Sequence, residues 1–205
     1  MKRITTWRNE GKTIATNILN NNGLILFPAD TIIGLATQVS KEGITKLDLI
    51  KNRQGGKNYA LIVDSVEMLE KLVEIDPKDK RVIIKNTPGY FTFVIRPKRI
   101  FESILHPIIS ANQTIGFRIP KSPLMIDLCR LADHPLIATS ANRSGEEPVN
   151  SVREALEKLQ NKLIDLVIDI ETDLSGRSST VVDLAENPPK ILRQGSCVFK
   201  KKLIR

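Results

Sequence analysis

Short apolar runs alternate along this chain with longer segments in which apolar residues recur at helical spacing. Each short run ends near Gly, Pro, Asn or Asp, which is typical of a buried strand. Alternating strands and helices predict a three-layer α/β arrangement. Short connections between successive strands, as between residues 180 and 193, favour a mixed sheet over a purely parallel one. We therefore expect an α/β (α+β) fold with a twisted mixed β-sheet flanked by helices.

The expected elements follow from these patterns. Strands are predicted at Leu24–Phe27, Tyr59–Val63, Phe91–Ile95, Gln113–Ile119, Leu136–Ala138, Ile164–Ile170, Thr180–Leu184 and Lys190–Arg193. Helices are predicted at 5–21 and 41–51, from Ser65, from Asp76 to Thr87, at Ser122–Leu131, and from a capping box of Ser151 and Glu154. Residues 29–35 and 98–113 are interpreted as loops, the second with a short apolar element at 104–109. Because no repeat, low-complexity tract or linker interrupts the pattern, we expect one domain over 1–205.

Composition narrows the class of protein. The chain has 205 residues, and its 31 Lys and Arg against 23 Asp and Glu give a net charge of +8. This surplus favours polyanions such as nucleotides or RNA, although a solvated basic surface needs no partner. The two cysteines, Cys129 and Cys197, lie far apart, and no apolar run approaches the roughly 18 residues of a membrane span. We expect a reduced, soluble, cytoplasmic protein with no bound metal and no membrane contact.

Polar residues follow several predicted strands, at the places where open α/β sheets bind ligands. Asp30 and Thr31 follow the first strand, and Ser140 and Asn142 follow the run Leu136–Ala138. Two residues apart on an extended chain, Ser140 and Asn142 point to the same side. The alternative is that these residues only form turns.

Cationic residues offer a second set of candidates. The segment KNRQGGK at 51–57 holds three cations around a glycine pair, which suits a polyphosphate or is an ordinary basic surface loop. Arg118 lies within an apolar strand beside Phe117 and Ile119. A cation there has a partner carboxylate or an anionic ligand, unless it simply faces water.

Seven motifs in order resemble the YrdC-like family, the threonylcarbamoyl-adenylate synthases of tRNA modification. They are PADTIIGL at 28–35, KNRQGGK at 51–57, PGYFT at 88–92, FRIP at 117–120, SANRSG at 140–145, STVVD at 179–183 and LRQG at 192–195. Each motif is modest, but together they cover nearly the whole chain. The resemblance implies a YrdC-like fold and a nucleotidyltransferase that converts L-threonine, bicarbonate and ATP to threonylcarbamoyl-AMP and pyrophosphate, with ATP carrying Mg²⁺.

The same resemblance implies roles for individual residues. Lys51, Arg53, Ser140 and Asn142 match the family's central K-x-R and S-x-N positions and are the candidate catalytic residues. The candidate ATP-binding residues are Arg53, Lys57, Asn142, Asn150 and Arg193. The candidate threonine-binding residues are Thr31, Arg118, Ser140 and Ser179. Both histidines, His106 and His134, lie outside the motifs and are interpreted as structural or surface residues.

Departures from the family pattern concern the amino-acid side of the site. Ala29 replaces the usual Thr, Ile33 replaces an aromatic residue, and Tyr90 replaces the second Pro of P-G-P. ATP binding is therefore predicted more firmly than the choice of threonine. The chain ends ten residues after Gly195, so it resembles the short members of the family. Such members imply a separate tRNA threonylcarbamoyl-transferase complex as a partner.

Two other functions compete with this one. A YrdC-like module that binds RNA without catalysis would also suit the basic charge and the altered pocket. The spacing of Lys51, Arg53, Ser140 and Asn142 argues against it, because RNA binding alone does not need that spacing. The third is carbamoyl transfer to another amine, as in hydrogenase-maturation relatives, whose acylphosphatase and zinc-finger segments are absent here. Weak binding of tRNA is compatible with the synthase itself.

Overall fold

The computed structural model describes residues 1–53, 59–105, 108, 112–159 and 161–199. Its strands are β1 (Lys2–Ile4), β2 (Ile25–Pro28), β3 (Ile33–Gln38), β4 (Ala60–Ile62), β5 (Phe91–Ile95), β6 (Ile115–Arg118), β7 (Leu136–Ser140), β8 (Leu166–Ile168), β9 (Thr180–Asp183) and β10 (Lys190–Arg193). Its helices are α1 (Asn9–Asn20), α2 (Lys41–Ile50), α3 (Val66–Leu72), α4 (Pro77–Asn86), α5 (Glu102–Leu105), α6 (Pro123–Ala132) and α7 (Val152–Lys158), with 3-10 turns at Arg99–Phe101 and Asn161–Leu163.

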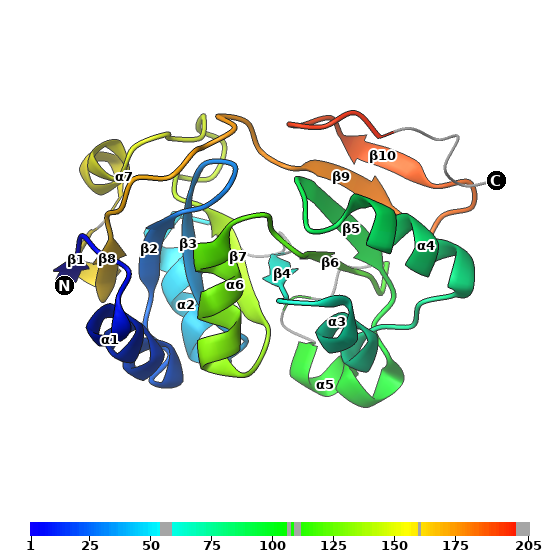
Figure 1. Cartoon of the computed structure of the whole chain (residues 1–205), viewed down its shortest axis with the longest axis horizontal. Coiled ribbons are helices and arrows are strands. Elements are labelled where there is room, and N and C mark those ends of the chain that lie inside the picture. Colours follow the sequence, from blue (N-terminus) through cyan, green and yellow to red (C-terminus); the bar gives the residue numbers. More distant parts are fainter. Residues whose placement is uncertain (54–58, 106–107, 109–111, 160, 200–205) are drawn as a thin grey trace.

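All ten strands form one mixed sheet in the order β1-β8-β2-β3-β7-β4-β6-β5-β9-β10 (Figure 1). The sheet contains parallel pairs, such as β4 with β6 and β5 with β9, and antiparallel pairs, such as β3 with β7 and β5 with β6. The expected mixed sheet flanked by helices is therefore confirmed.

Side chains alternate between two apolar clusters, one on each face of the sheet. One cluster contains residues of α2, α3, α4 and α7 with the inward residues of the strands, among them Leu61, Phe93 and Phe117. The other contains α1 and α6 packed on residues such as Phe27, Ile62 and Leu136. Because side chains along a strand alternate in direction, neighbouring strand residues separate cleanly into the two clusters. The sheet is thus the middle of three layers.

The helices α1 and α6 lie side by side and cover only part of the sheet face on which they pack (Figure 1). They pack against residues of β2, β3, β4, β7 and β8, while Thr92, Gly116 and Val181 of β5, β6 and β9 face a cavity. This unequal cover positions the site described below.

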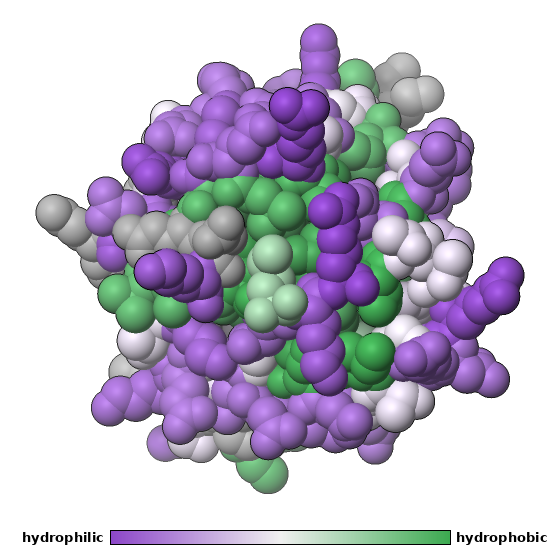
Figure 2. Space-filling model, turned by 90° about the vertical axis from the view of Figure 1, so that its left-hand side faces the viewer, coloured by the Kyte–Doolittle hydropathy of each residue, from purple (hydrophilic) through white to green (hydrophobic). Residues whose placement is uncertain are grey.

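The β1 side of the molecule is shown in Figure 2, where apolar side chains gather in the middle of a hydrophilic surround. β1 is the outer strand here, and it pairs in parallel with β8. This strand was not expected from the sequence. Lys2–Ile4 is short and mostly exposed, so it shows little of the pattern that marks a strand.

The sequence interpretation is wrong at one central place. Residues 29–35 were expected to form a loop, but Ile33–Gln38 is the strand β3, buried between β2 and β7. Gly34, Ala36 and Thr37 weaken the apolar signal of this strand, since their side chains are small or polar. The loop is limited to the residues between β2 and β3, which include Asp30 and Thr31.

Other elements begin and end close to their predicted bounds. The helix expected over 5–21 begins only at Asn9, and β7 continues two residues past Ala138 to Ser140. The capping role of Ser151 is confirmed, since its hydroxyl oxygen accepts the backbone N–H of Glu154 at 3.1 Å. The loop expected at 98–113 contains α5 and a 3-10 turn, and part of its apolar element at 104–109 lies outside the described residues.

Candidate active site

A cavity of about 550 Å³ opens on the α1 and α6 face of the sheet, beside α6. Its floor contains a row of small residues at matched positions on neighbouring strands, Ala138, Ala60 and Gly116. A methyl group at Gly116 would meet only ordinary contacts, the nearest at 3.4 Å, so the space above this strand is open. The floor can therefore accept a ligand against the backbone of the sheet.

The cavity brings together most of the residues predicted from the sequence. Those that line it are Thr31, Lys51, Arg53, Arg118, Ser140, Asn142, Ser179 and Arg193. Two predicted residues are not among them. Lys57 lies outside the described residues, and Asn150 is exposed just before the N-cap of α7.

Lys51 is the C-cap residue of α2, and its side chain is 2% exposed. Its ammonium donates hydrogen bonds to the carbonyl oxygens of Ser140 at 2.5 Å and Asn142 at 2.6 Å. Burial, with a smaller effect of the nearby Arg53 charge, lowers the pKa of Lys51 to about 8. Lys51 is thus a fixed cation whose charge can be lost in mildly alkaline solution.

The segment after β7 wraps around this lysine. The backbone N–H of Ser144 donates to the carbonyl oxygen of Lys51 at 3.0 Å. The carboxamide Nδ2 of Asn142 donates to the carbonyl oxygens of Arg143 at 3.0 Å and Glu146 at 2.7 Å, which orients the group. Its buried Oδ1 accepts no hydrogen bond within the described part of the protein. Such an oxygen is a ready acceptor for a ligand hydroxyl or amine.

Arg53 follows α2, where its backbone N–H donates to the carbonyl oxygen of Asp48 at 2.9 Å. Its guanidinium lies over the ring of Tyr59, 4.4 Å from the ring centre. The Tyr59 hydroxyl donates to a carboxylate oxygen of Asp48 at 2.6 Å. Burial, then this hydrogen bond, raise the pKa of Tyr59, so the residue stays a neutral phenol. Tyr59 was not among the residues predicted for the site, because its place at the start of an apolar strand does not mark it as the partner of a cation.

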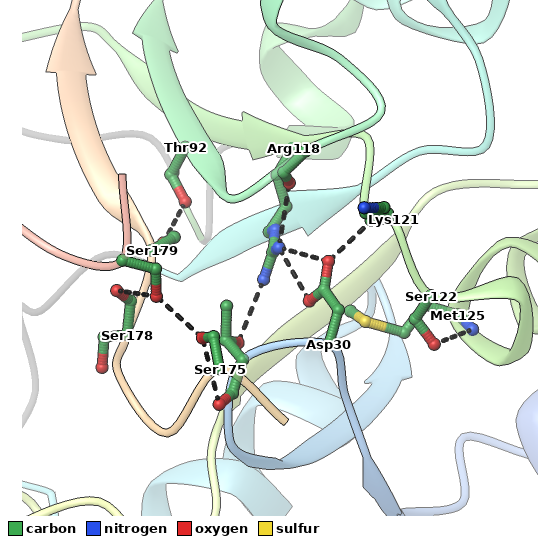
Figure 3. A network of polar contacts seen from close by, with 12 residues as sticks. Asp30, Thr92, Arg118, Lys121, Ser122, Met125, Ser175, Ser178 and Ser179 are labelled. Carbon is green, nitrogen blue, oxygen red and sulfur yellow. Dashed lines mark hydrogen bonds and ion pairs between the residues drawn. The ribbon is translucent and has the colours of Figure 1, made fainter. Parts of the chain in front are cut away.

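Arg118 points from the end of β6 towards the loop after β2 (Figure 3). Its Nη2 donates to both carboxylate oxygens of Asp30, at 2.8 and 2.9 Å, and to the carbonyl oxygen of Gly89 at 3.1 Å. Asp30 also accepts the backbone N–H of Lys121 at 2.7 Å. Of the alternatives for a cation in this strand, the partner carboxylate is therefore present, and Arg118 does not simply face water.

The other two nitrogens of the Arg118 guanidinium, Nη1 and Nε, do not contact Asp30. Nη1 lies 3.4 Å from the hydroxyl oxygen of Thr31, and the buried Nε has no partner among the described residues. Burial lowers the pKa of Arg118, while Asp30 opposes that shift. Asp30 was noticed in the sequence at a strand end but not linked to Arg118, since 88 residues separate them.

Ser179 forms the opposite side of the site, where its hydroxyl lies 2.7 Å from that of Thr92 (Figure 3). Arg193 of β10 donates from Nε and Nη2 to the Ser179 carbonyl oxygen at 3.1 and 3.0 Å. Burial, followed by the charge of Arg118, lowers the pKa of Arg193. Thr92, Thr114 and Asp183 also line the cavity, although the sequence interpretation did not include them.

The electrostatic character of the cavity follows from these residues. Lys51, Arg53, Arg118 and Arg193 line it, while Asp183 is the one acidic residue among the lining residues that the structure describes. Clustered cations inside a partly desolvated cleft attract an anion more strongly than they would in water. The geometry suits a ligand with several negative charges and a smaller polar part.

A family model described as "Telomere recombination", for Sua5, YciO and YrdC proteins, matches residues 17–195. The chain belongs to this family. Among its relatives is a threonylcarbamoyl-AMP synthase of Pyrococcus abyssi, 30% identical over 196 residues that cover 95% of this chain and 56% of the relative. Another is the uncharacterized protein YciO of Escherichia coli, 26% identical over 187 residues that cover 88% of this chain and 87% of that protein.

A crystal structure of Pyrococcus abyssi Sua5 complexed with L-threonine superposes with a TM-score of 0.83 at 26% identity. The superposition covers 95% of this chain and 57% of that one. This member of the Sua5, YciO and YrdC family thus spans little more than half the length of the Pyrococcus protein. The fold that the sequence predicted, including its resemblance to YrdC-like proteins, is confirmed.

Proposed function

We propose that this protein is a nucleotidyltransferase that makes threonylcarbamoyl-AMP and pyrophosphate from L-threonine, bicarbonate and ATP. The observation that carries the proposal is the convergence of Lys51, Arg53, Ser140 and Asn142 in one cationic cavity. The synthase relatives and the threonine-bound structure support it.

The reaction requires positioning and charge more than proton transfer. Bicarbonate takes up a proton and loses water to give carbon dioxide, and the amine of threonine adds to it to give a carbamate and release a proton. A carbamate oxygen then attacks the α-phosphorus of ATP, and the bond from that phosphorus to the oxygen of the leaving pyrophosphate breaks. Fixed cations stabilise the negative charge that builds up on the phosphoryl oxygens. We assign this task to Lys51 and Arg53, with Lys57 and Arg193 as further phosphate contacts.

Ser140 and Asn142 are proposed to orient both substrates. The unpartnered Oδ1 of Asn142 would accept a hydrogen bond from the substrate or the nucleotide. The backbone of the same two residues already fixes the Lys51 ammonium, so the substrate contacts and the cation are held by one segment. Asn150 stays a candidate nucleotide contact from the resemblance alone.

The amino-acid end of the site is assigned to Thr31, Arg118 and Ser179. Arg118 places Nη1 beside Thr31 while Asp30 holds Nη2, and a carboxylate matches such planar donors. Threonine is the amino acid bound by the Pyrococcus protein. Ala29 lines the cavity, and Ile33 is buried in the core next to it. Their difference from the family pattern therefore changes both the wall of the site and the packing behind it.

Magnesium is proposed to arrive with ATP. Within the described ranges, no three His, Cys, Asp or Glu side chains come together as a metal site, and the cavity has a single carboxylate there. These residues do not fit a resident metal ion. Phosphate oxygens are the usual Mg²⁺ ligands in nucleotide sites.

The product would be passed to a tRNA threonylcarbamoyl-transferase complex, in the cytoplasm. We also propose that residues 1–205 form a single domain and that the protein contacts tRNA weakly. In the described part of the chain, every helix is too short or too polar to cross a bilayer.

The test is pyrophosphate release by the purified protein with ATP, Mg²⁺ and bicarbonate. We expect release with L-threonine, less with L-serine, and almost none without an amino acid. Mass spectrometry of the mixture should show the threonylcarbamoyl adenylate. Release that does not depend on amino acid or bicarbonate would contradict the proposal.

The RNA-binding alternative is separated in the same assay. Salt-sensitive binding of tRNA with no pyrophosphate release for any amino acid would favour the module. Turnover in the absence of RNA would favour the synthase.

A further inference from the structure

Two arginines of the cavity are held by chemically different partners. Arg118 is held by the carboxylate of Asp30, whereas Arg53 lies on the aromatic ring of Tyr59. A carboxylate neutralises the cation that it orients. An aromatic ring attracts a cation through its quadrupole and carries no net charge of its own.

The cavity contains the reason why Arg53 needs an orienting partner. Lys51 is near enough that the charge of Arg53 lowers its pKa, so the two cations repel each other. A guanidinium on a long side chain would move away from such a neighbour unless something holds it. Contact with the Tyr59 ring at 4.4 Å opposes that movement.

The ring of Tyr59 is itself fixed. The side chain is 4% exposed, and its hydroxyl donates to Asp48 at 2.6 Å. Asp48 lies on α2, one turn before Arg53, and its carbonyl oxygen accepts the Arg53 backbone N–H at 2.9 Å. Asp48 is thus joined to Arg53 through the backbone at the end of α2, and to Tyr59, just before β4, through its side chain.

We propose that Tyr59 is a positioning residue that holds the Arg53 guanidinium in place for the phosphates of ATP. Asp48 orients the ring, and the ring sets the position of the cation. This inference rests on the proposed function in taking ATP as the ligand of Arg53.

The experiment measures dissociation constants for a non-hydrolysable ATP analogue by calorimetry. Tyr59→Leu removes the ring and should weaken binding roughly tenfold, the scale of a cation–π contact in a desolvated site. Tyr59→Phe keeps the ring and loses the hydroxyl, with its bond to Asp48 and its hydrogen bond with Arg53. It should therefore weaken binding less than Tyr59→Leu does, by about threefold. The affinity for L-threonine, which depends on Arg118 in this scheme, should change little in either variant.

A double-mutant cycle with Arg53→Ala decides whether Tyr59 acts through Arg53. In the Arg53→Ala background, Tyr59→Leu should cause almost no further loss of nucleotide affinity. An equal loss in both backgrounds would overturn the proposal, because Tyr59 would then act independently of Arg53. So would full affinity of the Tyr59→Leu protein.

Two further controls keep the outcome clear. If Tyr59→Leu does not fold, Tyr59→Met replaces it in the cycle, since it preserves length and apolar surface without a ring. Nucleotide binding does not require turnover. A wild-type protein that binds the analogue but releases no pyrophosphate would contradict the proposed function and leave the cycle to decide the role of Tyr59.

Discussion

Lys51 shows how burial can give one residue a pH-dependent role. Its ammonium is almost wholly buried and contacts two carbonyl oxygens, yet burial brings its pKa down to about 8. Below that pH the side chain is a cation that attracts phosphate. Above it the charge is lost, while the arginines of the cavity stay charged.

We therefore predict that ATP affinity falls as pH rises through about 8. Bound phosphate favours the charged lysine and raises its pKa, so affinity should begin to fall near the pKa of the free protein and level off only above the pKa of the complex. Calorimetric titrations of the ATP analogue from neutral to alkaline pH measure this. Lys51→Met removes the titrating group and should bind weakly with a flat profile. A falling profile that survives in Lys51→Met would assign the pH dependence to another group.

Arg118 carries a second prediction at the residue scale. Arg118→Lys keeps a positive charge but cannot contact Asp30 with one nitrogen and face Thr31 with another. We expect the KM for threonine to rise about tenfold, the effect of losing one charge-assisted hydrogen bond, with a smaller change in the KM for ATP. Steady-state pyrophosphate release at varied threonine checks this.

A surface ion pair elsewhere in the protein provides the control for Arg118→Lys. Arg130 contacts Asp64 at 3.4 Å on the surface, where the Arg130 side chain is 62% exposed. Arg130→Lys should leave both KM values unchanged, because an exposed ion pair contributes little. Wild-type threonine kinetics in Arg118→Lys would remove Arg118 from the amino-acid site.

At the scale of elements, α2 links the core to the site. The helix packs closely on the end of β3, and its last turn leads directly to Lys51 and Arg53. Gly43 makes this approach possible. A Cβ there would lie 2.7 Å from the Thr37 hydroxyl oxygen and 2.8 Å from the Gln38 carbonyl oxygen.

Gly43→Ala is therefore predicted to push α2 away from β3. Overpacking of this kind costs about 1–3 kcal/mol in the free energy of unfolding. Urea unfolding measures the loss, and ATP affinity should fall with it because the helix positions both cations. Leu49 lies on the same helix and is 57% exposed, so Leu49→Ala should change stability much less. Equal stability of Gly43→Ala and wild type would show that α2 does not depend on this close contact.

The elements also show what the sequence could and could not predict. Helices with a capping serine, such as those after Ser40, Ser65 and Ser151, have local signals, and the site lysine and arginine follow one of them. β3 was missed because Gly34, Ala36 and Thr37 interrupt its apolar pattern, and burial between two strands is a tertiary property.

The partners of the site residues were beyond the sequence for the same reason. Asp30 meets Arg118 because the loop after β2 reaches the end of β6, although β3, β7 and β4 lie between these strands in the sheet. Tyr59 meets Arg53 through a side-chain geometry that no spacing predicts. The order of the motifs predicted that the central residues share one site. The contacts that orient their side chains depend on the folded structure.

At the scale of the whole molecule, the net charge of +8 exceeds what the cavity uses. Four cations line the described part of the cavity, and Arg118 is paired there with Asp30. Other cations, such as Arg3 and Lys12, are paired with carboxylates at the surface. The remaining surplus can act on a polyanion over a wider area than one ATP molecule.

This surplus leads to the last prediction, that tRNA binds weakly and with a steep dependence on salt. Each phosphate neutralised by Lys or Arg releases counterions, so a few contacts should lower the affinity about tenfold or more between 50 and 200 mM salt. Fluorescence anisotropy with labelled tRNA at several KCl concentrations measures the slope. Synthesis of the adenylate should proceed at full rate without tRNA, because its chemistry involves only threonine, bicarbonate and ATP. Affinity that is independent of salt would show that the surplus charge does not face RNA, and a rate that requires tRNA would mean that RNA completes the site.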